Sequence, residues 1–300
     1  MRFLRSRDCY SNPEDVYLVA KARGMDLVTI TDHDSIEGCL ALLSRRPGAR
    51  DIFISEEVSC WLPDTGIQVH LGVYGTNEQL HREIQPLRGN VFDVIARLKA
   101  AGVFFALNHL LHFYHRQIPL ERYLRLLDHV PALEAHNGTM LRAHNDLVAF
   151  VARGVPMGRA FAITGGGDAH TLRRIGRTWT EAPGSNAPEF LQSLALMQST
   201  TGGVHGGVTA VAADAYGVVA KYCASLVGLG PCEQPLPRRL ACLAFSLVSL
   251  PAQFVPLMLV ASGKYREAGK VRHTDAELVA RLARTSQTPP LAAPKLESNP

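Results

Sequence analysis

DLVTITDHD, residues 26–34, is the stretch that decides the fold of this chain. Its first six residues form an apolar, β-branched run, which is typical of a short buried strand. The run leads directly into Asp32, His33 and Asp34. Burying such groups without partners is costly, and a bound metal ion would compensate for that cost. The stretch therefore predicts a strand that ends in side chains able to do chemistry.

Strands and helices are expected to alternate along the following chain. A first helix is expected to start near Ser11 and Pro13 and to end at Gly24. Further strands are expected over residues 52–58, 69–74, 103–107, 132–135 and 160–164, and helices over residues 35–44, 91–101, 120–127, 141–152 and 188–197. This alternation favours an α/β fold with a parallel sheet or barrel.

Polar residues gather where these strands end. In a parallel barrel the active site lies at the carboxyl ends of the strands, so residues far apart in sequence can meet there. Side chains alternate along a strand, so only one of Glu56 and Glu57 can face a barrel centre. We expect Glu57 there, although both carboxylates could instead be solvated at the strand end. The other candidates at strand ends are His33, His70, His109, Glu134, His136, Asp168 and His170.

Glu57, His70 and His109 could form one metal-ligand shell. A carboxylate and two imidazoles suit zinc, manganese or iron and disfavour calcium. The carboxylate has two oxygens and could bridge two cations, which an imidazole cannot do.

Asp168 and His170 follow a run of glycines, which lets the backbone turn sharply. Three arginines come next. Arg177, and after it Arg173, could hold an anionic substrate, because a guanidinium matches phosphate oxygens in a bidentate way. The same arginines could equally be ordinary solvent-facing charges.

Four further histidines are not expected to bind a metal. His112, His115 and His144 are expected on the surface. His205 lies in the glycine-rich residues 201–208, which are expected to form a flexible connector. A place for His205 at the rim of the site is the alternative.

Length and charge limit the class of protein. The 300 residues allow one large domain, or one domain with a smaller appendage. The net charge of +4 gives no strong signal for nucleic-acid binding. The six cysteines are scattered, and no CxxC pair or secretory leader is recognised. Reduced thiols and a cytoplasmic location are therefore expected.

Residues 240–263 contain no charged side chain. A run of this length could cross a bilayer, but two prolines and a glutamine weaken it as a span. Three interpretations stay open: a helix pair packed on the protein, contact of residues 236–272 with a membrane surface, and a true span. Residues 285–300, which hold four prolines, are expected to be disordered.

Several motifs together resemble those of the PHP (polymerase and histidinol phosphatase) superfamily. They fall in the family's order and spacing over roughly residues 9–185. The motifs are TDHD at residues 31–34, SEEVS at 55–59, HLG at 70–72, LNH at 107–109, ExxN at 134–137 and GGDAH at 166–170.

The resemblance implies a distorted (β/α)7 barrel that lacks its first strand, here over residues 1–200. From its own sequence pattern, the segment of residues 201–284 is expected to form a mostly helical extension. It also implies two or three zinc, manganese or iron ions and the hydrolysis of a small phosphorylated substrate, a monoester or a nucleotide-like molecule. The nucleophile would be a metal-bound hydroxide, and His33 or His170 would protonate the leaving alcohol. The implied metal ligands are Glu57, His70 and His109 for one site, His33 and His170 for a second, and Asp168, beside Glu57, for a third; the implied catalytic residues are His33, Asp168 and His170.

The chain also departs from the family pattern. No His-x-His strand precedes Asp32, so only the site of Glu57, His70 and His109 keeps its full ligand set. A leucine follows His109 where the family favours proline, and Gly167 stands where serine is usual. Either the start codon has been assigned downstream of the true one, which the surviving ligands favour, or the chain is a degenerate copy. The first case corresponds to a metal-dependent phosphoesterase, and the second to a catalytically inactive binding or regulatory module that could lie beside a membrane.

Overall fold

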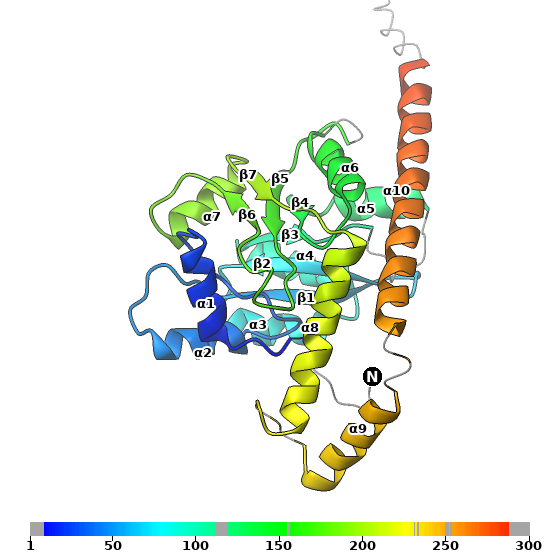
Figure 1. Cartoon of the computed structure of the whole chain (residues 1–300). Coiled ribbons are helices and arrows are strands. Elements are labelled where there is room, and N and C mark those ends of the chain that lie inside the picture. The colour runs from blue at the N-terminus through cyan, green and yellow to red at the C-terminus, as the bar shows by residue number, and fades with distance from the viewer. Residues whose placement is uncertain are drawn as a thin grey trace, which may run out of the picture.

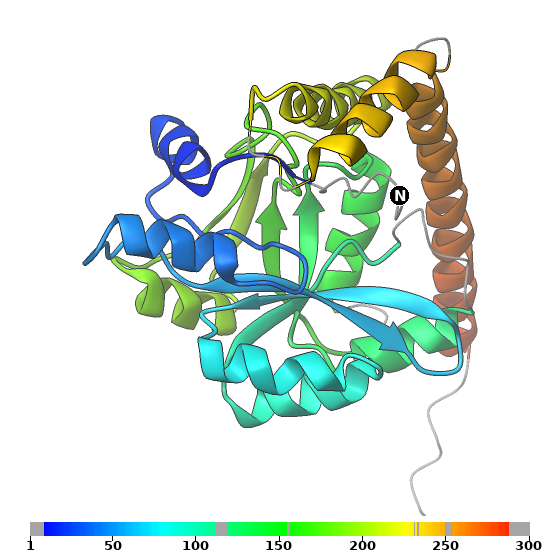
Figure 2. The ribbon, with the colours of Figure 1, turned by 90° about the horizontal axis from the view of Figure 1, so that it is seen from below.

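A mixed five-stranded sheet is the centre of the fold (Figure 1). The computed structural model describes residues 9–111, 119–154, 157–230, 232, 234–249, 252 and 254–287. The strands lie in the order β1-β2-β3-β4-β5; the pairs β1–β2 and β2–β3 are antiparallel, and the pairs β3–β4 and β4–β5 are parallel. Their bounds are Ser55–Leu62, Ile67–Tyr74, Phe104–Leu107, Ala132–Asn137 and Ala162–Gly166. In Figure 2 the β1–β2 hairpin lies crosswise to β4 and β5.

The prediction of an α/β fold with parallel strands is confirmed for β3, β4 and β5. β1 and β2 form an antiparallel hairpin instead, because only residues 63–66 separate them and a parallel pair needs a much longer crossover. β1 and β5 stand at the two ends of the strand order. Closure into a (β/α)7 barrel therefore stays a prediction. A second, antiparallel pair consists of β6 (Thr178–Glu181) and β7 (Thr200–Gly203).

The predicted first strand is wrong as a continuous strand. Only isolated parallel bridges form there, Val28 with Ile52 and His33 with Glu57. Between these bridges the hydroxyl of Thr29 donates to the carbonyl opposite it at 2.7 Å, so a side chain replaces part of the backbone ladder. The segment still runs beside the chain that leads into β1, and it delivers His33 next to Glu57.

Helices accompany the sheet at nearly all the predicted places. The predicted helices are confirmed to within a few residues, and α3 is an addition. At the start of the first helix, the side chain of Asn12, rather than Ser11, accepts the amide of Glu14 at 3.0 Å. The bounds are α1 Pro13–Ala22, α2 Glu37–Arg45, α3 Glu78–Ile84, α4 Val91–Ala100, α5 Leu120–Leu127, α6 Arg142–Ala152 and α7 Ala187–Ala195, with the 3-10 helix η1 at Gln85–Leu87.

One apolar cluster joins the helices to the sheet. On α4 the buried side chains are Val91, Val94, Ile95 and Leu98, which share one face of the helix. They pack in the same cluster as Leu71 of β2. The core therefore lies under the β1–β2 hairpin and holds the strands that carry the polar residues.

Three helices form the C-terminal part: α8 (Val208–Leu226), α9 (Leu236–Val248) and α10 (Val255–Gln287). The uncharged run at residues 240–263 is divided between α9 and α10. Among the described residues, no helix combines the length and the apolarity needed to cross a bilayer. Residues 285–287 belong to α10, so the prediction of disorder from residue 285 is wrong there. Residues 288–300 lie outside the described part.

A buried ion pair fixes α10 to the loop that follows β4. The Nζ atom of Lys264 lies 2.6 Å from Oε2 of Glu267 and donates to the carbonyl of Thr139 at 2.5 Å. Oε1 of Glu267 accepts the amide of Leu141 at 2.7 Å. The two charged side chains are 3% and 0% exposed. Both are therefore satisfied by each other and by the loop backbone.

Replacing Lys264 by methionine is expected to lower the free energy of unfolding by about 3–5 kcal/mol, because the carboxylate of Glu267 would stay buried without its partner. Urea unfolding followed by circular dichroism measures this change. The matched control is Arg82→Met, which breaks the exposed pair of Arg82 with Glu78. That control should cost less than about 0.5 kcal/mol, and equal losses in both variants would contradict the anchoring role.

Candidate metal centre

β1 turns its two neighbouring glutamates to opposite faces of the sheet. Glu56 is fully buried, and its Oε2 atom lies 2.8 Å from Nδ1 of His81 and 3.2 Å from Nε2 of Gln85. Glu57 points to the other face, toward histidines from three separate segments. The two side chains thus point to opposite faces, as the alternation along the strand predicts.

Three ligand atoms converge beside Glu57. Its Oε1 atom lies 3.0 Å from Nε2 of His109 and 3.6 Å from Nδ1 of His70, and the two nitrogens are 3.2 Å apart. β1 supplies the carboxylate, β2 supplies His70, and His109 lies just after β3. Tetrahedral ligands at roughly 2.1 Å from a zinc ion stand about 3.4 Å apart. The three donor atoms therefore fit a single cation of this size.

The second oxygen of Glu57 faces another histidine. Oε2 lies 3.4 Å from Nε2 of His33, and the rings of His33 and His70 meet edge to face with centroids 4.8 Å apart. Ligand atoms of His33, Glu57 and His70 all lie within 4.8 Å of one another. Glu57 thus presents each of its oxygens to a different donor group, as a carboxylate that bridges two cations must.

The charges of the centre depend on these contacts. Burial opposes ionisation of Glu57, but hydrogen bonds with His109 and His70 outweigh it and hold the pKa of this carboxyl well below its usual range. Burial also opposes the charge on His109, yet the hydrogen bond with Glu57 raises its pKa to about 9. Burial lowers the pKa of His70. A cation that binds here must displace the proton of His109, so its affinity should rise with pH.

Asp168 and His170 lie on the loop after β5. Oδ2 of Asp168 accepts hydrogen bonds from Oγ1 of Thr139 at 2.7 Å and Nδ2 of Asn137 at 3.3 Å, while Oδ1 lies 3.9 Å from Nδ1 of His170. Burial would raise the pKa of Asp168, but the charges of His170 and His109 outweigh it and lower that pKa. Asp168 is therefore close enough for its pKa to respond to the charges of the centre. His170, 39% exposed, stands at its open edge.

The backbone adopts rare conformations beside the ligands. Asp34, His109 and Asp168 have φ values of 54°, 25° and 43°, a region that residues other than glycine rarely occupy. Each is held by contacts: the amide of His109 donates to Oε2 of Glu134 at 3.0 Å, and Asp34 forms an ion pair with Arg88. Burial raises the pKa of Glu134 to about 7.

Sequence reasoning missed the side chains that hold the carboxylates. Nδ2 of Asn108 donates to Oε1 of Glu57 at 2.8 Å, and Thr139 donates to Asp168. Asn108 is the middle residue of the LNH motif, but no role is expected for it from the sequence. Nothing in the sequence distinguishes Thr139 from an ordinary loop threonine.

The three arginines after His170 have different surroundings. Arg173 and Arg177 are exposed, so their contact with a phosphate stays a prediction. Arg174 is only 5% exposed, and its Nε atom lies 3.1 Å from Oδ2 of Asp214 on α8. It also donates to the carbonyl of Gly138. Arg174 is therefore part of the packing between α8 and the loops of the centre.

His144 on α6 is fully buried, and the prediction of a surface position is wrong. Its Nε2 atom accepts the amide of Leu111 at 3.3 Å, and burial lowers its pKa to about 3. The face of α6 that carries His144 is turned to the core rather than to solvent, and this explains why the surface prediction failed. His112 and His115 lie outside the described residues.

The connector predicted over residues 201–208 is ordered at its start, because Thr200–Gly203 forms β7. His205 follows, and its ring stacks on that of His136 with centroids 4.4 Å apart. Its Nδ1 atom lies 2.8 Å from Nδ2 of Asn145. His205 is thus held by two neighbours on the β4 side of the sheet.

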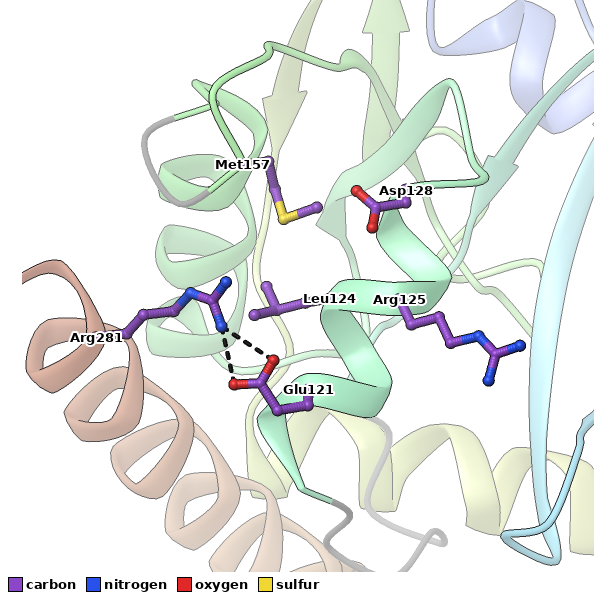
Figure 3. Close-up of a pocket in the computed structure, with 6 residues that line it drawn as sticks. All are labelled: Glu121, Leu124, Arg125, Asp128, Met157 and Arg281. Atoms are coloured by element: carbon purple, nitrogen blue, oxygen red, sulfur yellow. Dashed lines mark hydrogen bonds and ion pairs between the residues drawn. The ribbon is translucent and has the colours of Figure 1, made fainter. Parts of the chain in front are cut away.

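Two cavities on the described surface lie apart from the metal centre. One, of about 290 Å³, lies between α5 and α10 (Figure 3), where Nη1 of Arg281 contacts both carboxylate oxygens of Glu121 at 2.8 and 3.0 Å. The other, of about 370 Å³, is lined in part by Phe92, Arg122 and His129. Neither lining contains a predicted metal ligand.

A Glu57→Gln variant is expected to lose bound metal, because it removes the shared charge between the imidazoles. Elemental analysis of the purified chain after exposure to zinc or manganese measures the metal content. The matched control is Glu56→Gln, one residue away on the opposite face, which should keep the metal. Unchanged metal content in the Glu57 variant would contradict the assignment.

His144 is expected to make the protein sensitive to acid. Its folded pKa of about 3 lies below the unfolded value of 6.5, so its contribution to stability is complete above pH 6.5 and is lost as the pH falls. Between pH 8 and pH 5 the loss should be about 2 kcal/mol. Urea unfolding at pH 8 and at pH 5 measures this loss in the free energy of unfolding. In His144→Gln the loss between the two pH values should be smaller by about this amount. Parallel pH profiles would contradict this expectation.

Two solved structures resemble this fold in part. A protein of Bifidobacterium adolescentis, provisionally named a metal-dependent phosphoesterase, matches 63% of this chain and 90% of its own at 15% identity, with a TM-score of 0.44. A two-domain protein of Bacteroides vulgatus, named as containing a predicted PHP-like metal-dependent phosphoesterase, matches 72% of this chain and 65% of its own at 14% identity, with a TM-score of 0.47. The chain thus spans just under two thirds of that second protein. No curated protein matches the sequence.

One family model matches part of the sequence. Residues 150–196 match the family described as PHP-associated. The matched segment contains β5, α7 and the loop with Asp168 and His170, which is the place of the GGDAH motif. For this segment, the match supports the resemblance to the PHP (polymerase and histidinol phosphatase) superfamily that the motifs indicate.

Proposed function

We propose that this protein hydrolyses phosphate esters with divalent cations held around Glu57. The observation that carries the proposal is the orientation of this carboxylate: Oε1 faces His70 and His109, and Oε2 faces His33. A carboxylate in this position can hold two cations side by side. Two neighbouring cations are the usual arrangement for hydrolysis of a phosphate ester.

The donor atoms limit the choice of cation. Imidazole nitrogens with carboxylate oxygens suit zinc, manganese or iron, whereas calcium prefers oxygen alone. When bound, such cations polarise the phosphoryl oxygens and lower the pKa of a coordinated water.

The protein's own side chains position the ligands and move the proton. Asn108 donates to Oε1 of Glu57 and fixes the plane of the carboxylate. The leaving alcohol needs a proton, and the donor must be reachable from solvent. His33 and His170 meet this condition, since their side chains are 38% and 39% exposed. Oδ1 of Asp168 lies 3.9 Å from Nδ1 of His170.

A small phosphate monoester or a nucleotide-like molecule is the proposed substrate. Arg173 and Arg177 are exposed on the loop that follows His170, where either guanidinium could hold the phosphate oxygens. Arg174 is committed to Asp214 and takes no part.

A metal-binding module without catalysis is the second candidate. It is favoured by Asp168, because Thr139 and Asn137 already occupy its Oδ2 atom. That oxygen is then less available to a third cation.

The purified chain is expected to hydrolyse an aryl phosphate in the presence of manganese or zinc and to lose this activity when a chelator is added. Glu57→Gln should abolish turnover, because cations would no longer be held together. Arg177→Gln should raise KM by about tenfold with a smaller change in kcat, because one charge-assisted contact is worth about 1.5–3 kcal/mol. Metal binding without turnover of any aryl phosphate would contradict the proposed hydrolysis. The metal-binding module without catalysis would then be the remaining interpretation.

A further inference from the structure

α9 turns apolar side chains outward and a charged one inward. Phe245 is 50% exposed and Val248 is 81% exposed. Arg239, by contrast, donates from Nε and Nη2 to the carbonyl of Leu226 in α8. A helix on the surface of a globular protein ordinarily has the reverse arrangement. The exposed apolar side chains of α9 are Leu236, Pro237, Leu240, Ala241, Ala244, Phe245, Leu247 and Val248.

The first turns of α10 repeat this arrangement. Met258 and Leu259 are 60% and 61% exposed, and Tyr265 is 75% exposed. Lys264 and Glu267, which belong to the same stretch of helix, are buried against the loop after β4. The polar side chains therefore hold the helix to the protein, and the apolar side chains face solvent.

The two exposed faces lie at one end of the molecule. Figure 1 shows α9 projecting beyond the sheet, and Figure 2 shows α9 meeting the start of α10 at a corner. An exposed apolar surface of this extent marks a binding surface rather than chance. We call it the apolar patch; it consists of Leu240, Phe245, Val248, Met258 and Leu259.

The stretch of sequence that carries the apolar patch contains basic residues but no acidic ones. Residues 235–266 contain no aspartate or glutamate. Arg238 stands at one end of this stretch, and the exposed Arg266 stands at the other. A two-fold contact with a second copy would bring the patch against itself and place arginines near arginines. An anionic surface is the better complement.

We propose that the apolar patch docks on the surface of an anionic lipid membrane. The apolar side chains enter the boundary between head groups and acyl chains, and the helices lie in the plane of the surface. Tyr265 and Arg266 have the amphipathic character that suits the level of the head groups. The exposed Arg266 gains the attraction to anionic lipids.

Vesicle flotation of the purified chain tests the proposal. The chain should float with vesicles of phosphatidylcholine mixed with phosphatidylserine, and much less with phosphatidylcholine alone. Leu259→Glu should lower the partition onto mixed vesicles at least about tenfold, because a charge replaces buried apolar area. Arg266→Gln should lower it about fivefold.

The matched control is Val279→Glu, because Val279 is 58% exposed on the same helix but outside the patch. It should bind vesicles like the unchanged chain. Circular dichroism and metal content must be equal in all variants. Absence of binding to mixed vesicles, or an equal loss in Val279→Glu and Leu259→Glu, would overturn the proposal. If the unchanged chain does not bind vesicles but forms a dimer in solution, and Leu259→Glu dissociates that dimer, the proposal would also be overturned.

Discussion

The burial of one carboxylate is the constraint on which the rest of the site depends. Glu57 is 8% exposed, and an ionised group at such a place needs partners on every side. The antiparallel register supplies them, because it sets Gly72 opposite Glu57 and His70 opposite Ser59. A side chain at residue 72 would begin 2.6 Å from the hydroxyl of Tyr74 and 2.9 Å from Oδ1 of Asn108. The glycine of the HLG motif therefore leaves the space that the side chains of Tyr74 and Asn108 occupy.

The parts of this site that follow from periodicity could be predicted from the sequence. Alternation along β1 separates Glu57 from Glu56, and the apolar run before His109 places that residue at a strand end. The direction of β2 could not be predicted with equal ease, since an apolar pattern is the same for parallel and antiparallel strands. The positive φ of His109 also has no sequence signal, because a tertiary contact with Glu134 holds it.

The C-terminal helices contribute to the site through polar contacts that sequence patterns do not reveal. Asp214 of α8 binds both Arg174 and Thr171 of the loop after β5. Lys264 of α10 binds the carbonyl of Thr139, whose hydroxyl holds Asp168. In the sequence these residues look like ordinary charges on amphipathic helices, because their partners are distant along the chain. The helical extension is thus an outer support for the loops that carry the ligands.

The same polar contacts fix which side of α10 faces solvent. Rotating the helix so that Met258 and Leu259 became buried would pull Lys264 and Glu267 away from the loop after β4. Thr139 and Leu141 would then lose their contacts with the ion pair, and both charges would leave their partners. The cost of breaking such a pair, about 3–5 kcal/mol, is comparable to the gain from burying two large apolar side chains. The exposed apolar patch is therefore held outward by the residues that support the loop after β4, so the proposed membrane docking and the positioning of Asp168 depend on one helix.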